Sequence, residues 1–368
     1  MKATDSDLIA RAVAQGEHGR RSASPNPWVG CVIVDEHGAI AGEGWHRSPG
    51  TPHAEANALV AAGERARNGT AYVTLEPCPH DGRTPPCADA LIAAGVRRVV
   101  VSLEDPDPRV AGRGFARLRA AGLDVEVGPG ATSARRSLAP YLHHRRTGRA
   151  WCLVKTAMSL DAKTAAADGS SRWITGVAAR ADAHRLRAES QAVVIGAGTA
   201  LADRPSLTAR DVDGPIDRQP LRVLLDARGR APAAGPLFDA GLAPTLVVTT
   251  EAAPSEAVDA WRAAGAKVET VPAAPGGVDL VATLELLGRY GVLTALFEGG
   301  ATLHGALLAA GLVDRLVAYV SPKVLGPGGL PAFRAPDVDT VADAEAWRLL
   351  SATPIDDDVR LEYEPEDG

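Results

Sequence analysis

The sequence has 368 residues, enough for two or three domains that each bury a core. Hydrophobic residues make up 46% and charged residues 23%, an ordinary globular composition that argues against disorder and against a membrane protein. Residues 1–150 carry 19 Lys and Arg against 16 Asp and Glu, and residues 151–368 carry 20 against 29. Neither half is basic enough to suggest a nucleic-acid partner, so a small-molecule substrate is favoured.

The N-terminal segment, the apolar stretches and the cysteines indicate the cellular compartment in which we expect the protein. The N-terminal segment has no apolar signal core, and no apolar stretch is long enough to span a bilayer. The four cysteines, at positions 31, 78, 87 and 152, show no disulfide framework. We therefore expect a cytoplasmic protein with no membrane partner.

Strand and helix patterns alternate through the first 150 residues, which predicts an α/β layered domain. A first helix capped by Asp5 or Ser6 should run to about Gln15. The later expected elements are a strand at 29–34 with a hairpin turn at 35–38, a helix from His53, a strand at 70–75, a helix at 87–95, a strand at 96–101, a helix at 114–122 and a strand at 123–127.

The main chemical motif is His53-Ala54-Glu55, followed by Pro77-Cys78 and then Cys87. Zinc binds imidazole nitrogen and thiolate sulfur, and three protein ligands leave its fourth position open to water, as in a catalytic site. Glu55 would then carry protons between the water and the substrate. His-x-Glu followed by Pro-Cys is typical of the zinc deaminases, although eight residues separate these cysteines where the general motif has two. The alternative is a pair of unpaired thiols and a surface histidine.

The spacing also restricts where the metal can lie. Pro52 suits the first turn of a helix, so His53 and Glu55 should stand near a helix start. Residues two apart on a helix point to roughly opposite sides. We therefore expect the zinc ion over the end of the helix, where Glu55 can reach the water.

The second half reads as another α/β domain. Residues 135–149 form a basic connector, which we interpret as a solvated helix and linker. The predicted domains are residues 1–147 and residues 148–368. The acidic C-terminal end is interpreted as a last strand with a solvated tail. Strands are expected at 152–158, 192–195, 221–226, 245–250, 267–271, 293–298 and 315–320.

Two features of this half suggest anion binding. Glu298-Gly299-Gly300 ends a strand, and backbone N–H groups of a helix starting at Thr302 could hold a phosphate, with a plain tight turn as an equal alternative. Lys155 within an apolar strand could serve an anion, or could snorkel at a sheet edge. Gly196-Ala-Gly198 lacks the third glycine of a dinucleotide fingerprint, so a Rossmann domain is not supported.

Several motifs together resemble the bifunctional riboflavin-biosynthesis deaminase/reductase family, which has the long cysteine spacing. They are Ser24 to Val34, His53 to Glu55, Leu75 to Cys87, Glu104 to Pro108, Val110 to Gly114, Ser159 to Asp161, Trp173 to Thr175, Thr199 to Asp203 and Glu298 to Gly300. The resemblance implies an α/β protein with an N-terminal cytidine-deaminase-like three-layer domain and a C-terminal dihydrofolate-reductase-like domain.

The resemblance also implies two phosphorylated pyrimidine substrates. One zinc ion per chain would take part in the deamination of 2,5-diamino-6-ribosylamino-4(3H)-pyrimidinone 5′-phosphate. NADPH would reduce 5-amino-6-(5-phosphoribosylamino)uracil to its ribitylamino product. A homo-oligomer is left open. The rival hypothesis is a zinc nucleoside or tRNA deaminase fused to an unrelated α/β domain.

Further residues are assigned by position in the family. Those expected at the deaminase substrate are Asn26, His80 and Arg83. Those expected at the reductase substrate are Lys155, Ser171, Arg187, Leu207, Arg210 and Glu298. Those expected at the cofactor are Ala157, Trp173, Thr199, Asp203, Gly300, Ala301, Thr302, Leu303, His304, Gly305 and Ala306. Ser24, Ala157 and Arg204 depart from the family pattern.

Overall fold

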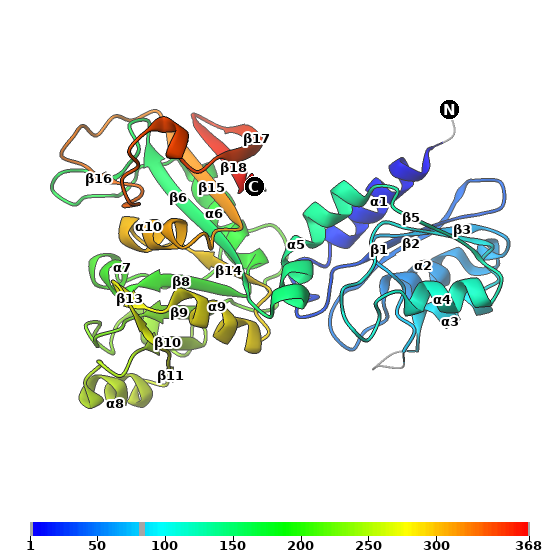
Figure 1. Ribbon diagram of the computed structural model, residues 1–368, viewed down its shortest axis with the longest axis horizontal. Coiled ribbons are helices and arrows are strands. Elements are labelled where there is room, and N and C mark those ends of the chain that lie inside the picture. Colours follow the sequence, from blue (N-terminus) through cyan, green and yellow to red (C-terminus); the bar gives the residue numbers. More distant parts are fainter. Residues whose placement is uncertain (1–2, 81–84, 367–368) are drawn as a thin grey trace. The chain divides into compact units, whose positions relative to one another are not determined.

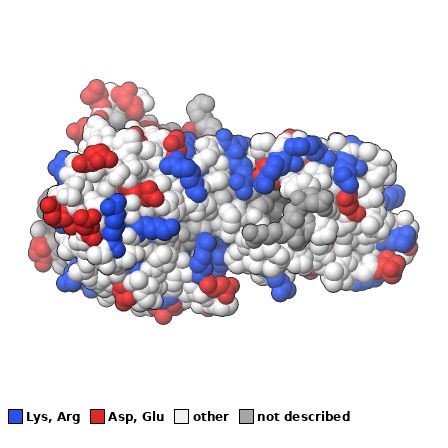
Figure 2. Space-filling view, turned by 90° about the horizontal axis from the view of Figure 1, so that it is seen from below, with Lys and Arg blue, Asp and Glu red and all other residues white. Residues whose placement is uncertain are grey.

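The computed structural model describes residues 3–80 and 85–366, which form two compact units, Met1–Gly148 and Arg149–Gly368 (Figure 1). Each unit is built on its own main β-sheet. Within the described ranges, every helix is too short or too polar to cross a lipid bilayer. Figure 2 shows one face of the molecule, on which acidic and basic side chains are interspersed over mostly uncharged surface.

The first unit has three layers around a five-stranded sheet of order β2-β1-β3-β4-β5. Its strands are β1 (Gly30–Val34), β2 (Ile40–Trp45), β3 (Thr70–Val73), β4 (Arg98–Val101) and β5 (Asp124–Val127), and its helices are α1 (Asp5–Glu17), α2 (Ala54–Ala62), α3 (Cys87–Ala93), α4 (Arg113–Ala120) and α5 (Ala131–Thr147). β1 is antiparallel to β2 and β3, whereas β3, β4 and β5 are parallel.

Alternate residues of β1 explain the layering, since successive side chains of a strand point to opposite faces. Cys31 and Ile33 pack in the core that contains α2, α3 and α4. Val32 and Val34 pack on the other face against α1. A strand covered on both faces has to be apolar at every position, which explains the continuous hydrophobic run.

Three local predictions in this unit need correction. Thr4, not Asp5 or Ser6, caps α1, because its hydroxyl accepts the Asp7 N–H while the Asp7 carboxylate accepts the Thr4 N–H. His53 is the N-cap of α2, so Pro52 lies before the helix. The helix expected in the basic segment 135–149 is present as the larger part of α5, but it is not simply solvated, because one face of this helix is buried.

The second unit contains a nine-stranded sheet of order β11-β10-β9-β8-β14-β6-β15-β18-β17. Its strands are β6 (Trp151–Ser159), β8 (Ala192–Gly196), β9 (Leu221–Leu225), β10 (Thr245–Thr249), β11 (Lys267–Thr270), β14 (Thr294–Phe297), β15 (Arg315–Ser321), β17 (Trp347–Ile355) and β18 (Asp358–Pro365). Its helices are α6 (Val177–Glu189), α7 (Ala197–Asp203), α8 (Ser255–Ala263), α9 (Leu280–Arg289) and α10 (Ala301–Ala309). Short strands β7 (Lys163–Ala165) with β16 (Leu330–Pro331), and β12 (Ala273–Ala274) with β13 (Gly277–Val278), form two small ladders.

All seven strands predicted for this half are present, and they pair in parallel from β11 to β15. The C-terminal prediction is incomplete, because β17 and β18 form an antiparallel hairpin. The expected last strand is β18, which contains Asp358, Glu362 and Glu364, whereas Asp356 and Asp357 form the two-residue turn that joins it to β17.

Candidate active sites

Three side chains of the first unit converge as a candidate metal site. His53 is the N-cap of α2, Cys87 is the first residue of α3, and Cys78 lies in the loop after β3. The Nδ1 atom of His53 lies 3.3 Å from the Cys87 sulfur and 3.6 Å from the Cys78 sulfur. Their potential ligand atoms all lie within 4.8 Å of one another.

These distances fit a zinc ion. Zinc–sulfur bonds of about 2.3 Å and a zinc–nitrogen bond of about 2.1 Å at tetrahedral angles place ligand atoms roughly 3.5–3.8 Å apart. A hydrogen bond from the Cys87 thiol lowers the pKa of Cys78, and further hydrogen bonds from His53 and the Cys87 backbone N–H act in the same direction. Cys78 is therefore favoured as a thiolate, the form that binds metals.

Glu55 lies in the first turn of α2, beside this group. Its side chain is buried, and burial raises the pKa of its carboxyl group. A carboxyl group with a raised pKa exchanges protons more easily near neutral pH, which is what general acid and base catalysis requires.

Asn26 joins this site through a histidine that the sequence interpretation missed. The Nδ2 atom of Asn26 lies 3.1 Å from Nε2 of His46, whose Nδ1 atom lies 3.3 Å from the carbonyl oxygen of Pro52. The His46 ring also packs edge-on against His53, with 5.0 Å between ring centroids. His46 stands seven residues before His53, and no spacing rule in the sequence indicates a residue of this kind.

Of the other two predicted deaminase substrate residues, the structure describes only His80, which lies in the loop after β3. His80 is half-buried and follows Cys78 by two residues in the loop. Arg83 lies outside the described residues.

In the second unit, a cavity of about 430 Å³ lies where the predicted reductase residues converge. Five predicted residues line it: Lys155, Ala157, Trp173, Arg187 and Arg210. Five lining residues that were not predicted as site residues carry polar side chains: Arg180 and His184 on α6, Tyr319 on β15, and Thr175 and Asp211 in loops. The helical spacing of Arg180, His184 and Arg187 could have indicated one shared face.

The cavity wall contains a buried ion pair. Arg187 donates from Nε to Oε1 of Glu298 at 2.6 Å and from Nη2 to Oε2 at 2.7 Å. Lys155 lies close to this pair, and burial lowers the pKa of its ammonium group while the Glu298 charge opposes the change. His184 has a pKa lowered to about 4 by burial and by the nearby Arg187 and Arg210, so it is neutral at pH 7.

The remaining predicted residues of this unit lie outside the cavity lining. Leu207 is buried. Ser171 lies in a loop next to Arg172, and Asp203 is the last residue of α7. The Nη2 atom of Arg172 donates to the Asp203 carbonyl oxygen at 3.5 Å. Thr199 neighbours Gly300, because a Cβ atom added to Gly300 would lie 3.6 Å from the Thr199 hydroxyl.

The predicted glycine turn leads directly into α10. Gly300 is the N-cap and the helix begins at Ala301, one residue before the predicted Thr302. Among the described residues no side chain caps this end, so its first backbone N–H groups can donate hydrogen bonds to a phosphate. His304 and Gly305, one turn further along, are buried in the protein and do not face this end.

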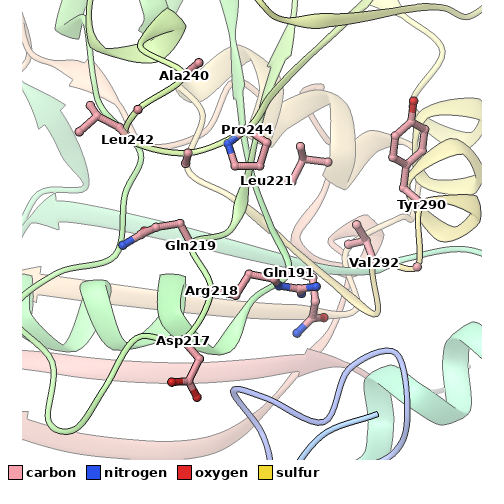
Figure 3. A pocket seen from close by; sticks show the side chains of 13 residues that line it. Gln191, Asp217, Arg218, Gln219, Leu221, Ala240, Leu242, Pro244, Tyr290 and Val292 are labelled. Atoms are coloured by element: carbon pink, nitrogen blue, oxygen red, sulfur yellow. The ribbon is translucent and has the colours of Figure 1, made fainter. Parts of the chain in front are cut away.

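A second cavity of about 420 Å³ lies at the amino ends of the strands, where β8, β9, β10 and β14 begin (Figure 3). Its lining includes Gln191, Gln219, Leu221, Pro244 and Tyr290, and contains none of the predicted site residues. Predicted residues such as Thr199, Glu298 and Gly300 instead follow the carboxyl ends of β8 and β14, where ligands of α/β sheets usually bind.

Comparison with known proteins identifies both units. Residues 150–361 match the family described as the RibD C-terminal domain, and residues 2–103 match the cytidine and deoxycytidylate deaminase zinc-binding region. The chain belongs to the RibD family. The riboflavin biosynthesis protein RibD of Chlamydia trachomatis is 46% identical over 358 residues, covering 97% of this chain and 94% of that protein. RibD of Escherichia coli is 42% identical over 369 residues, covering 97% and 98%.

The solved structure of Acinetobacter baumannii RibD, form 1, superimposes with a TM-score of 0.88 at 39% identity, covering 99% of both chains. The predicted fold is therefore confirmed as a cytidine-deaminase-like domain followed by a reductase domain of the RibD type. The chain is a bifunctional deaminase and reductase of riboflavin biosynthesis with a zinc-binding deaminase domain, acting on small phosphorylated pyrimidines. The RibD match over residues 150–361 excludes the alternative of an unrelated second domain.

Proposed function

We propose that residues 1–147 carry the deaminase and residues 148–368 the reductase, with the individual roles given below. The main support for a deaminase in the first unit is that the ligand atoms of His53, Cys78 and Cys87 converge at distances that suit zinc. When bound, the zinc lowers the pKa of a coordinated water to about 7 and so supplies a nucleophile at neutral pH.

The residues around the metal perform the proton transfers and the positioning. Glu55 takes one proton of the attacking water and delivers it to the ring nitrogen of 2,5-diamino-6-ribosylamino-4(3H)-pyrimidinone 5′-phosphate. It then moves the remaining proton of the added hydroxyl group to the amine, which leaves as ammonia while the carbonyl group forms. Its burial excludes bulk water from this exchange. Asn26, held by His46, orients the pyrimidine, together with His80 and Arg83.

The reductase acts on the deaminated product, 5-amino-6-(5-phosphoribosylamino)uracil. When bound, NADPH supplies the hydride that converts the ribosyl group to ribityl. The open amino end of α10 takes a cofactor phosphate, with Thr199 and Gly300 side by side at that place. Ala157, Trp173 and Asp203 complete the cofactor site, and only the amino-terminal part of the 300–306 segment faces the cofactor.

The substrate lies in the 430 Å³ cavity beside Lys155. Arg187 is engaged by Glu298. Arg180 donates to the Thr175 carbonyl oxygen and lies over the Trp173 ring. We therefore assign the substrate phosphate to Arg210, which also lines the cavity. The Arg210 side chain is 53% exposed, and its nearest ion-pair partner among the described residues is Asp211 at 3.6 Å. Ser171 and Leu207 complete the substrate site.

A Cys87→Ser variant tests the two-site assignment. It should lose bound zinc and ammonia release, because one of three metal ligands becomes a poor one. NADPH oxidation with the deaminated substrate should persist, since the reductase residues belong to the other unit. Metal analysis and both assays on the same preparation check this, and zinc retention with full ammonia release would contradict the proposed site.

A further inference from the structure

The loop that carries Arg210 joins α7 to β9 and has an irregular backbone. Leu207 and Asp211 have φ angles of 53° and 55°, in the left-handed region that residues other than glycine rarely adopt. A loop of this kind depends on contacts with the rest of the protein to hold one conformation.

Gln219 provides such a contact at Ala209, ten residues earlier in the chain. The Ala209 N–H donates to Oε1 of Gln219 at 2.8 Å, and Nε2 of Gln219 donates to the Ala209 carbonyl oxygen at 2.9 Å. The side-chain amide thus pairs with the peptide group as a neighbouring strand would. Only a carboxamide side chain offers the donor and the acceptor in this arrangement.

The same loop is held from the cavity side by Arg187. Its Nη1 atom donates to the Thr208 carbonyl oxygen at 3.1 Å, while its other nitrogens bind Glu298. Thr208 and Ala209 are therefore fixed from two directions. Arg210 is the next residue, so these contacts fix the backbone position from which its side chain extends. Arg210 lines the same cavity as Lys155.

Gln219 itself does not touch this cavity. It lines the second cavity, beside Leu221 and Pro244, and Figure 3 shows its side chain there. Any effect of Gln219 on the reductase substrate has to pass through the loop.

We propose that Gln219 is a positioning residue that sets the affinity of the reductase for its phosphorylated substrate by holding Arg210 in place. This inference rests on the proposed function, in which Arg210 binds the substrate phosphate.

The test uses Gln219→Met in the full-length protein, because methionine has a similar length but makes neither hydrogen bond. We expect the reductase KM for the phosphorylated substrate to rise roughly tenfold, with kcat within about twofold and NADPH affinity unchanged. Gln219→Glu keeps one of the two hydrogen bonds and should raise KM in the same direction. Asp217→Asn, on the same loop and cavity, should leave all constants unchanged.

Two further measurements separate positioning from general destabilisation. An unchanged NADPH affinity already reports that the second unit, which contains Gln219, is folded. In an Arg210→Ala background, Gln219→Met should raise KM by less than about twofold, because the residue through which it acts is gone. With the dephosphorylated substrate, the wild type and the Gln219→Met variant should likewise show little difference in KM.

The outcomes distinguish the positioning role of Gln219 from the phosphate-binding role of Arg210 on which it rests. If Arg210→Ala raises KM but Gln219→Met does not, the positioning role is wrong and the phosphate site stands. If Gln219→Met raises KM equally with and without Arg210, Gln219 acts by another route and the inference is overturned. If Arg210→Ala leaves KM unchanged, the proposed phosphate site is wrong and the inference falls with it.

Discussion

Arg187 and Glu298 form a bidentate ion pair beside the reductase cavity, with side chains that are 16% and 9% exposed. Burial raises the pKa of Glu298, but the charges of Arg187 and Lys155 outweigh this effect and lower it to about 2. Glu298 is therefore a carboxylate throughout the neutral range. Since it neutralises Arg187, the phosphate of the substrate needs a different cation.

Removing one partner of this pair should destabilise the second unit. We expect Glu298→Ala to lower the free energy of unfolding by about 3–5 kcal/mol, because the buried Arg187 would keep its charge without a counter-charge. Thermal and urea unfolding at pH 7 measure this. Arg262→Ala, which removes an exposed pair with Asp259 at 3.7 Å, is the matched control and should cost about 1 kcal/mol or less.

The stability difference between wild type and Glu298→Ala should depend on pH, because the pKa of Glu298 is lowered in the folded protein. The folded pKa of Glu298, about 2, lies below its ordinary value of 4.5. Its stabilising contribution is therefore complete above pH 4.5 and is lost as the pH falls from about 4.5 towards 2. The difference in stability between wild type and Glu298→Ala should shrink over that window, and a constant difference would contradict the proposed charge state.

Glu55→Gln should separate the two activities. Glutamine keeps the shape of the side chain, but its amide cannot take up and release a proton, so we expect ammonia release to fall by a factor on the order of 10² or more. Zinc content and NADPH oxidation with the deaminated substrate should stay at wild-type levels. A parallel fall of both activities in a folded, zinc-loaded protein would show that the carboxyl group has another role.

The zinc triad illustrates how much the sequence could predict. His53, Cys78 and Cys87 were found from ligand type and order, and helix starts were correctly expected at His53 and Cys87. Central strands such as β1 and β8 are present as predicted because each is a continuous apolar run that has to be buried. The edge strands β5 and β11 are also present, although they contain charged residues and are partly exposed.

Other contacts could not be predicted because they join residues far apart in the chain. The pairing of Arg187 with Glu298 spans 111 residues, and it changes which arginine remains free for a phosphate. Thr4 was missed as a cap because Asp5 and Ser6 are equally good capping residues, and only the backbone conformation distinguishes them. The β17–β18 hairpin was missed because its strands are only partly buried and show no clear alternation.

Two glycines of the α10 segment, the N-cap Gly300 and the interior residue Gly305, should respond differently to an added side chain. At Gly300, φ is −76° and an added Cβ atom would meet its nearest neighbour, the Thr199 hydroxyl, at 3.6 Å, so the free protein can accept it. Gly300→Val should therefore fold normally but bind NADPH at least about tenfold more weakly, because the branched side chain blocks approach to the helix end.

Gly305→Ala is the contrasting variant. Its Cβ atom would lie 2.0 Å from the Arg334 carbonyl oxygen, so we expect a lower unfolding temperature even without cofactor. NADPH titration followed by fluorescence, with thermal unfolding of both variants, distinguishes the two effects. Unchanged NADPH affinity in Gly300→Val would place the cofactor phosphate elsewhere.

Glu76 connects the zinc loop to α4 in a way that no sequence motif indicated. It is buried, lies two residues before Cys78, and accepts hydrogen bonds from the backbone N–H groups of Gly114 at 2.8 Å and Gly112 at 3.0 Å. The N–H groups of Asp105 and Phe115 lie at 3.3 Å from its carboxylate oxygens. The carboxylate thus caps α4, whose own N-cap, Gly112, has no side chain to do so.

Glu76→Ala should leave these buried N–H groups without acceptors, at a cost of at least about 2 kcal/mol. Because Glu76 also anchors the segment that presents Cys78, zinc should be lost to a chelator faster than from wild type. Glu76→Gln keeps one acceptor oxygen and should lie between the two, whereas Glu104→Ala, an exposed neighbour, should change neither property. Thermal unfolding and chelator competition measure both effects, and wild-type values for Glu76→Ala would show that the α4 cap and the zinc loop are independent.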